Sequence, residues 1–544
     1  MRRPASRSNS SDIERQQSPA VPRVRHGAVR RRKKAAAVWL RLSPRDLASL
    51  LSMSCVIILG IFYLLYRIDR ILVVGDTTKG STPSGTFLPP YPKISRDPAI
   101  QLSPEALDMC TRTLWHTLET TTIVLPNAET FIHTGDIDDL WLRDSASQVH
   151  PLLIPVLNGT TSLVQTDPRL DRIVAGLIKR TAMYIRHDPY ANAFRIDDSY
   201  KFSAEQKRLG RHDLISTFNY ELDSACFYIR MIYFYWRQSL HGKTADSVLR
   251  LPQVEQAVEI MVDVWISEQR HEDDAYPTGP LFDCLNCNKP YRYVELPRNG
   301  KGTPTNASSG LTWSGFRPSD DMNTYGYNVP GQMFCIAALG YVQTLASHAW
   351  QNDKLAKKAA RLAADIQRGL DEHAIVNHPE FGKIYAYEVD GLGNHLLMDD
   401  ANVPSLMSIP YLGYKDYNVE IYTNTRRFIL SPSNPTYRSG TNELTGPVQG
   451  YGSPHMNARI PNNIWPMALA VQGLTSDNVD EKIELVETLV KASAGTGWMH
   501  ESFDVNNPKI YTRSWFCWAD ALFGAFSFAR IVTPRLCYLC IVRP

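Results

Sequence analysis

Apolar residues recur at helical spacing from about residue 105 to residue 531, in segments separated by loops rich in Gly, Pro and aromatic residues. Ser103-Pro104-Glu105 is a helix-start signature ahead of the first segment. The same spacing predicts helices over residues 145–157, 171–185, 216–240, 253–268, 329–350, 354–373, 401–412, 419–429, 464–474, 480–494 and 514–531. We find neither a regular short-strand pattern nor a strand–Gly-rich-loop–helix unit, so the pattern predicts an all-α domain.

About a dozen helices within residues 105–531 are typical of helix pairs closed into an α/α barrel or toroid. The sequence contains no strict internal repeat that would require such a closure. The periodicity by itself therefore supports a mostly helical fold, and the barrel is an expectation from helix number and domain length.

An uncharged apolar segment, residues 47–66 from Leu47 to Tyr66, is long enough to cross the hydrocarbon core of a bilayer. A cleaved signal peptide would start nearer Met1 and would be followed by small residues, whereas Arg67 follows here. The preceding residues 1–46 contain thirteen Lys and Arg and are expected to be disordered. We therefore expect one transmembrane helix with a cytoplasmic basic tail, a type II membrane protein with its large C-terminal part in the lumen.

The features after this anchor agree with a lumenal location in the endoplasmic reticulum or Golgi. Residues 67–104 form a stem whose sequence is rich in Gly, Ser, Thr and Pro from residue 75 on, and Asn158-Gly-Thr and Asn306-Ala-Ser are glycosylation sequons. The two CxxC pairs, at Cys284 and Cys537, lie too far apart in sequence to favour a zinc cluster. A local disulfide between Cys284 and Cys287 is the better interpretation in an oxidising compartment.

Candidate chemistry is densest near residues 311–331 (LTWSGFRPSDDMNTYGYNVPG). The adjacent carboxylates Asp320 and Asp321 lie among aromatic residues such as Trp313, and near Arg317. Aromatic faces stack on sugar rings, and arginine and carboxylate groups hydrogen-bond hydroxyls, so this mixture favours a carbohydrate site. The alternative is an ordinary helix start with Ser319 or Asp320 as N-cap. The net charge of +3 gives no indication of nucleic-acid binding.

Acidic, aromatic and arginine residues also recur together at other loop-to-helix junctions. These clusters are HTGDIDDLWLRDS (133–145), YELDS (220–224), DDANVPSL (399–406), GSPH (452–455), WMHESF (498–503) and YTRSWFCWAD (511–520). Taken singly, Asp144 could be an N-cap, Arg143 could pair with a neighbouring carboxylate, and Glu221 and Asp223 could be solvated. Their recurrence favours a shared site.

GDIDDLWLRDS, SGFRPSDD, DDAN, GSPH and HESF…YTRSWFCWADALFG resemble glycoside hydrolase family 125 from about residue 100 to residue 530. The resemblance implies an exo-acting α-1,6-mannosidase with an (α/α)6 barrel, an inverting mechanism, and no catalytic metal or other cofactor. It also implies a general acid in SGFRPSDD, either Asp320 or Asp321, and a general base, Glu501, in HESF. The anchor and stem resemble those of membrane-anchored fungal members. His500 or Arg513 would help to keep Glu501 ionised.

The resulting expectation is an (α/α)6 catalytic domain at 105–531, preceded by one transmembrane helix and followed by a tail, 532–544, without an assigned role. A mannose-containing glycan would be its substrate and partner, with residues 271–310 as an insertion near the site. The expected substrate-binding residues are Trp141, Arg143, Asp144, Trp313, Arg317, Asp399, Asp400, Asn402, His455 and Arg513. The alternatives are another (α/α)6 glycosidase or glycoside phosphorylase, or a non-catalytic glycan-binding protein.

Overall fold

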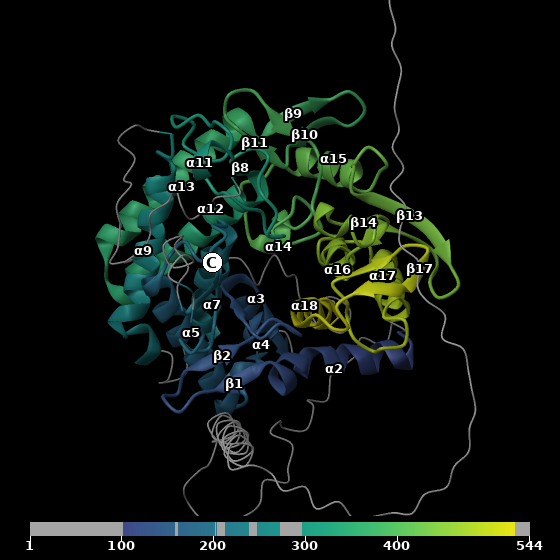
Figure 1. The fold of residues 1–544 in the computed structure, drawn as a ribbon, viewed down its shortest axis with the longest axis horizontal. Helices are drawn as coiled ribbons and strands as arrows, with labels where there is room; N and C mark the ends of the chain where they lie inside the picture. Colours follow the sequence, from purple (N-terminus) through teal and green to yellow (C-terminus); the bar gives the residue numbers. More distant parts are fainter. Residues whose placement is uncertain are drawn as a thin grey trace, which may run out of the picture. The chain divides into compact units, whose positions relative to one another are not determined.

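Helices between residues 104 and 527 form an outer and an inner layer of a barrel, as Figure 1 shows. The computed structural model describes residues 102–157, 161–201, 203, 213–238, 247–272 and 296–527. The predicted basic tail, the anchor at 47–66, nearly all of the stem, the Asn158 sequon, both CxxC pairs and the tail at 532–544 lie outside these residues.

The outer layer consists of long helices that bury one face. Its members in the described part of the chain are α2 (Pro104–Thr120), α5 (Pro168–His187), α9 (Pro252–Glu268), α13 (Asp353–His373), α15 (Val419–Ile429) and α17 (Val479–Ala492). In α13, Leu355, Leu362 and Ile366 are buried, whereas Lys357 and Arg361 are exposed. This amphipathic spacing allowed the outer helices to be predicted from the sequence.

The inner layer is buried on nearly every side. Its members are α3 (Leu142–Gln148), α4 (His150–Leu153), α7 (Asp223–Gln238), α12 (Val329–Leu345), α14 (Ile409–Leu412), α16 (Pro466–Leu474) and α18 (Cys517–Ser527). By length and composition, Val329–Trp350 alone among the described helices could cross a membrane, but 78% of its most apolar window is buried in the barrel. It is therefore a core helix.

Outer and inner helices alternate along the chain. Helix α2 is followed by α3, α5 by α7, α9 by α12, α13 by α14, α15 by α16, and α17 by α18. Along the inner layer, α7 packs against both α3 and α12, and α18 packs against α3 and α16. The last helix, α18, also packs on the first, α2, which closes the ring. This arrangement confirms the expected (α/α)6 barrel.

Side-chain caps explain where several of these helices begin. The Ser103 hydroxyl accepts the Ala106 N–H, as the helix-start signature predicts. Asn328 caps α12, Asn352 caps α13 and Asn418 caps α15 in the same way. Each cap satisfies a backbone donor that the first helical turn leaves free, and it thereby fixes the loop that leads into the helix.

Short strands join the helix ends, which the apolar pattern did not predict. They are β1 (Thr122–Val124), β2 (Thr130–Ile132), β3 (Leu140–Trp141), β4 (Pro155–Leu157), β5 (Thr161–Ser162), β6 (Ala193–Phe194), β7 (Ile215–Thr217), β8 (Tyr327–Asn328), β9 (Ile375–His378), β10 (Gly382–Tyr385), β11 (Glu388–Val389), β12 (His395–Leu396), β13 (Tyr437–Asn442), β14 (Gly446–Tyr451), β15 (Asn463–Ile464), β16 (Ser502–Asp504) and β17 (Asn507–Thr512). All pairings are antiparallel, in the orders β1-β2, β3-β6-β7, β4-β5, β12-β11-β8, β10-β9, β13-β14 and β15-β16-β17. Strands of two to six residues are too short to show a period of two in the sequence, and they leave the all-α class of the barrel unchanged.

Three predicted helices differ from the structure. The helix predicted over residues 216–240 begins only at Asp223, because Ile215–Thr217 forms β7. Residues 401–412 form a helix only at α14, because Pro404 interrupts the segment and the buried Asp399 carboxylate accepts the N–H groups of Leu406 and Met407. Residues 145–157 divide into α3, α4 and β4, with Pro151 near the division. The remaining short elements are α11 (Pro297–Gly300), η1 (Leu163–Gln165), η2 (Ala346–Trp350) and η3 (Pro454–Met456).

Candidate active site

The loop that carries Asp320 and Asp321 is tightly folded and is not a helix. The Arg317 N–H donates to the Asp321 carbonyl at 2.7 Å, and the Asp320 N–H donates to the Arg317 carbonyl at 3.0 Å. Asp320 has a φ of 66°, in the left-handed region that a non-glycine residue occupies at a cost of about 1 kcal/mol or more. The helix-start alternative is therefore wrong. The two side chains remain 33% and 29% exposed, so both are open to a ligand.

Arg143 forms the centre of a group of carboxylates, which we call the Arg143 cluster: the buried Asp144, Glu221 and Asp223, and the partly exposed Asp320. One guanidinium nitrogen, Nη1, lies 2.5 Å from Glu221 Oε2 and 3.6 Å from Asp223 Oδ2. Nε lies 3.5 Å from Asp144 Oδ2, and Nη2 lies 3.9 Å from Asp320 Oδ2. The alternatives of a solvated Glu221 and Asp223 and of Asp144 as N-cap are both wrong, because Trp141 caps α3 and all three carboxylates are buried.

Burial determines the protonation of the Arg143 cluster. It raises the pKa of Asp144 to about 6 and that of Asp223 to about 6, although Arg143 opposes both shifts. Burial also raises the pKa of Glu221 well above its ordinary value. For Arg143, burial alone would lower the pKa, but Glu221 and the other carboxylates raise it. The three buried carboxylates beside this permanent cation are thus protonated more readily than exposed carboxylates.

Asn192 links Asp320 to this cluster. Its Nδ2 donates to Asp320 Oδ1 at 3.0 Å and to Glu221 Oε1 at 3.1 Å. Its Oδ1 accepts the Thr217 hydroxyl at 2.6 Å and the Asn219 N–H at 3.1 Å, which fixes the orientation of the amide. Asn192 lies just before β6, and sequence analysis missed it because it lies outside every acidic or aromatic cluster.

His455 lies between the Asp320–Asp321 loop and the segment that carries Glu501. Its Nδ1 is 2.9 Å from Asp321 Oδ1, and η3 carries it in the GSPH motif. The hydrogen bond with Asp321 raises the pKa of His455; burial opposes this shift, and the charges of Glu501 and Asp320 add to it. The chemistry-bearing residues from SGFRPSDD, GSPH and HESF are therefore close enough to act on one another electrostatically.

Glu501 precedes β16, and its N–H donates to the Thr512 carbonyl at 3.2 Å. The side chain is 12% exposed, and Oε1 lies 4.0 Å from Arg513 Nη1. Burial raises the pKa of Glu501, whereas Arg513 lowers it. Arg513 in turn donates from Nε to Asp136 Oδ1 at 2.6 Å. His500 points elsewhere, because its Nδ1 meets the Arg513 carbonyl at 2.9 Å and its ring stacks on Tyr511.

Several residues expected to bind substrate are instead buried and hydrogen-bonded to other groups of the protein. Arg317 Nε donates to Glu388 Oε1 at 2.5 Å, and Glu388 is fully buried. Asp400 Oδ2 accepts the Ser319 hydroxyl at 3.1 Å, and Asn402 Nδ2 donates to the Pro318 carbonyl at 3.0 Å. The side-chain oxygens of the buried Asp399 accept backbone N–H groups, and burial raises the pKa of Asp399 to about 8. We correct the expectation of direct sugar contact for these four residues: Arg317, Asp400 and Asn402 hold the Asp320–Asp321 loop, whereas Asp399 orders the segment that leads into α14.

The two tryptophans predicted to bind sugar have different environments. Trp141 lies on β3 and remains partly exposed beside the Arg143 cluster. Trp313 is only 1% exposed and stacks on His271 at 3.6 Å between ring centroids, beneath the loop. Any Cβ on Gly326 would lie 2.4 Å from its ring. The prediction that Trp313 contacts sugar therefore needs correction: its role is packing.

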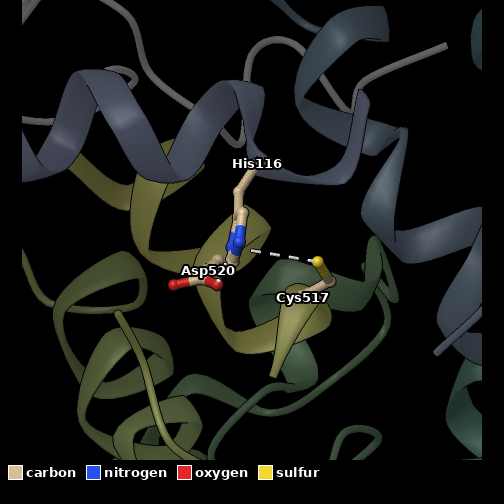
Figure 2. A group of neighbouring side chains, drawn as sticks. All are labelled: His116, Cys517 and Asp520. Atoms are coloured by element: carbon tan, nitrogen blue, oxygen red, sulfur yellow. Dashed lines mark hydrogen bonds and ion pairs between the residues drawn. The ribbon is translucent and has the colours of Figure 1, made fainter. Parts of the chain in front are cut away.

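A third group, His116, Cys517 and Asp520, has the composition of a metal site, and Figure 2 shows it between α2 and α18. His116 Nδ1 lies 2.6 Å from Asp520 Oδ2, and the same Nδ1 lies 4.0 Å from Cys517 Sγ. The nitrogen that would bind a cation thus already forms a direct hydrogen bond. Burial also raises the pKa of the Cys517 thiol, which disfavours the thiolate that a metal requires.

Comparison with known proteins places this geometry in context. Residues 103–528 match the family described as metal-independent alpha-mannosidase, GH125. The meiotically up-regulated gene 157 protein of Schizosaccharomyces pombe is 36% identical over 431 residues, which cover 77% of this chain and 79% of that protein. A solved metal-independent alpha mannosidase of Streptococcus pneumoniae, in a non-productive substrate complex with alpha-1,6-mannobiose, is 35% identical with a TM-score of 0.67. That match covers 80% of this chain and 94% of the other.

The barrel, the open carboxylates and these matches together define a glycoside hydrolase of the (α/α)6 class. The chain belongs to the GH125 family of metal-independent alpha-mannosidases, as the resemblance of its motifs predicted.

Proposed function

We propose that this alpha-mannosidase is exo-acting and inverting and that it removes terminal α-1,6-linked mannose from glycans of the secretory pathway. The observation that carries the proposal is the contact of Asp321 with His455 at 2.9 Å, with the partly exposed Asp320 next to Asp321 and with Glu501 near enough for its charge to raise the pKa of His455. Inversion requires one carboxyl to protonate the departing oxygen and another to activate water on the opposite face of the sugar. The α-1,6 linkage is inferred from the mannobiose bound by the Streptococcus pneumoniae relative.

Glu501 is the base in this proposal, and the Asp320–Asp321 pair supplies the acid. Both aspartates are open to a ligand, and each has a different partner: Asp320 joins the Arg143 cluster, and Asp321 joins His455. Trp141, His455 and Arg513 are the partly exposed candidates for contact with the terminal sugar. Arg143 and Asp144 act from just below the surface, because each is only 3% exposed.

A panel of linkage-defined mannobiosides tests the substrate. We expect release of mannose from α-1,6-mannobiose at a kcat/KM at least about tenfold above that for the α-1,2, α-1,3 and α-1,4 isomers, which corresponds to ~1.4 kcal/mol of transition-state discrimination. Equal rates on every isomer would reject the linkage. Activity that requires inorganic phosphate would instead indicate a phosphorylase, which the concentration of carboxylates around His455 disfavours because a phosphate dianion would be repelled.

Chelation should leave the activity unchanged. The acid–base pair provides a complete route without a Lewis acid, and the family is described as metal-independent. We expect less than a twofold change in kcat/KM after dialysis against EDTA, with an added calcium series as the control. Loss of activity that calcium restores would contradict the proposed mechanism.

We propose further that the catalytic domain is lumenal and that residues 47–66 anchor it. The support is the basic flank before the apolar segment and the sequons after it. At the described sequon, Asn306 is partly buried: Nδ2 donates to the Gly391 carbonyl at 3.1 Å, and Oδ1 accepts the Ser308 N–H. One Nδ2 hydrogen remains for a glycan bond.

Sealed microsomes test this topology. Added protease should remove only the basic tail, and endoglycosidase should reduce the mass of the protected fragment. A fragment that starts in the stem, near residue 90, should be soluble and fully active, because the stem contributes little core. A catalytic domain that is accessible to protease and carries no glycan would contradict the orientation and the compartment.

A further inference from the structure

The segment that carries Glu501 is hydrogen-bonded to the start of α18. The Met499 N–H donates to Asp520 Oδ1 at 2.8 Å, and the Met499 carbonyl accepts the Phe516 N–H at 2.8 Å. Both backbone groups of Met499, two residues before Glu501, are thereby fixed. Two residues span at most about 7 Å, so displacement of Met499 would be transmitted to the Glu501 backbone.

Asp520 is itself fixed by a histidine from the other end of the chain. Figure 2 shows His116 of α2 reaching the Asp520 carboxylate on α18, with 2.6 Å between Nδ1 and Oδ2. The His116 ring stacks on Trp498 at 3.7 Å between centroids, so the pair also holds the residue just before Met499. Both side chains are almost wholly buried, at 4% and 0% exposure, where a charge-assisted hydrogen bond is strong and its loss costly.

The geometry separates this pair from a catalytic triad made of the same residue types. In a nucleophile–histidine–carboxylate triad, the nucleophile and the carboxylate occupy opposite ring nitrogens. Here Cys517 and Asp520 both approach Nδ1, so Cys517 is not activated as a nucleophile. Cys517 also differs from Asp520 in that its thiol contacts the Thr120 hydroxyl, at 3.8 Å, whereas Asp520 bonds the segment that carries Glu501.

We propose that His116 and Asp520 are positioning residues that orient the Glu501 carboxylate through the 498–501 segment. This inference rests on the proposed role of Glu501 as the base. Removing the pair's hydrogen bond would displace the carboxylate relative to the attacking water, so the loss should fall on kcat rather than on KM. Supporting partners of this kind usually contribute 10- to 100-fold to activity, and a displacement of 1 Å can cost about 100-fold.

The test is a double-mutant cycle with the full chain and an aryl α-mannoside. Asp520→Asn keeps the size of the side chain but replaces the carboxylate oxygen that accepts from His116. We expect it to lower kcat by about 10- to 100-fold with KM changed less than about threefold. In the Glu501→Gln background, the same substitution should lower the residual kcat by less than about threefold, because two residues that act through one group are not additive. Cys517→Ala is the matched control, with activity within about twofold of the parent.

Each outcome decides the proposal. Equal losses from Asp520→Asn in both backgrounds would overturn it, because the pair would then act on the whole fold and not through Glu501. An equal loss in Cys517→Ala, with a stoichiometric bound metal in the parent, would overturn it in favour of a metal site. If Glu501→Gln is inactive while Asp520→Asn retains full kcat, the positioning role alone fails.

If Glu501→Gln is fully active, the proposed base fails before the pair is tested, and the positioning proposal falls with it. Asp520→Asn is a buried change, so His116→Gln provides a second variant if the first does not fold. It loses the stacked ring on Trp498 and moves the donor, and the same selective loss of kcat in the parent background is expected.

Discussion

Replacing Glu501 by Gln should lower kcat on α-mannosides by at least about a thousandfold while the barrel remains folded. The amide has the same size as the carboxylate but cannot accept a proton from the attacking water. The side chain lies at the edge of the site, 12% exposed and 4.0 Å from Arg513, so its neutralisation leaves no buried charge without a partner elsewhere. Steady-state kinetics beside a thermal unfolding curve measure both parts of this expectation.

Glu443→Gln is the matched control, because Glu443 is exposed in the turn between β13 and β14. It should retain the parent kcat and melting temperature. A Glu501→Gln enzyme with near-normal turnover would remove Glu501 from the mechanism. A variant that is inactive because it is unfolded would leave a melting curve unlike that of the parent, which separates loss of fold from loss of the base.

Asp320→Asn and Asp321→Asn should both be severely impaired on α-1,6-mannobiose, and the dependence on leaving group should identify the acid. The variant that lacks the general acid should lose about 10²–10⁴ in kcat on the mannobioside but much less on an aryl mannoside, whose leaving group needs little protonation. The other aspartate should lose similar factors on both substrates, because it positions the site through Asn192 and Arg143 or through His455.

Asp504→Asn is a suitable control, since Asp504 bonds only local backbone N–H groups in the β16–β17 turn among its described contacts. Equal losses on both substrates in both doublet variants would contradict the assignment of the acid to this pair. Near-normal activity on the mannobioside in both would contradict it even more directly.

The fold was largely predictable because most helices carry their own signals. Amphipathic spacing gives α15 with the predicted bounds, and α13 to within one residue. Residues 401–412 failed because their apolar residues are buried by an irregular segment around Asp399 and Pro404, which has the composition of an inner helix without its hydrogen bonds. Apolar periodicity indicates burial, and in this segment the apolar residues are buried although most of it is not helical.

The candidate site was predictable as a set of motifs but not as an arrangement. Sequence proximity suggested that Trp313 and Arg317 line the site beside Asp320. In the fold both side chains are buried: Trp313 packs on His271, and Arg317 pairs with Glu388. Glu388 and Asn192 lie outside the clusters that the sequence analysis singled out at loop-to-helix junctions. Their roles depend on partners 71 and 128 residues away along the chain, which no local pattern encodes.

Electrostatic coupling was the least predictable property. The Arg143 cluster combines residues from α3, α7 and the Asp320 loop, and the raised pKa values of its buried carboxylates come from burial that only the closed barrel supplies. The polar junction at 220–224 was visible, but whether its carboxylates faced solvent or one cation depended on the packing of α7 against α3.

Proton NMR of the first-formed product tests the central claim most directly. The purified enzyme is mixed with an aryl α-mannoside, so that all released mannose comes from the cleaved bond, and the anomeric signals of this mannose are followed before mutarotation equilibrates them. A base that activates water on the face opposite the departing oxygen yields β-mannose first, with the α anomer appearing only as the sugar mutarotates. Release of α-mannose as the initial product would contradict the inverting acid–base pair that Asp320, Asp321 and Glu501 are proposed to form.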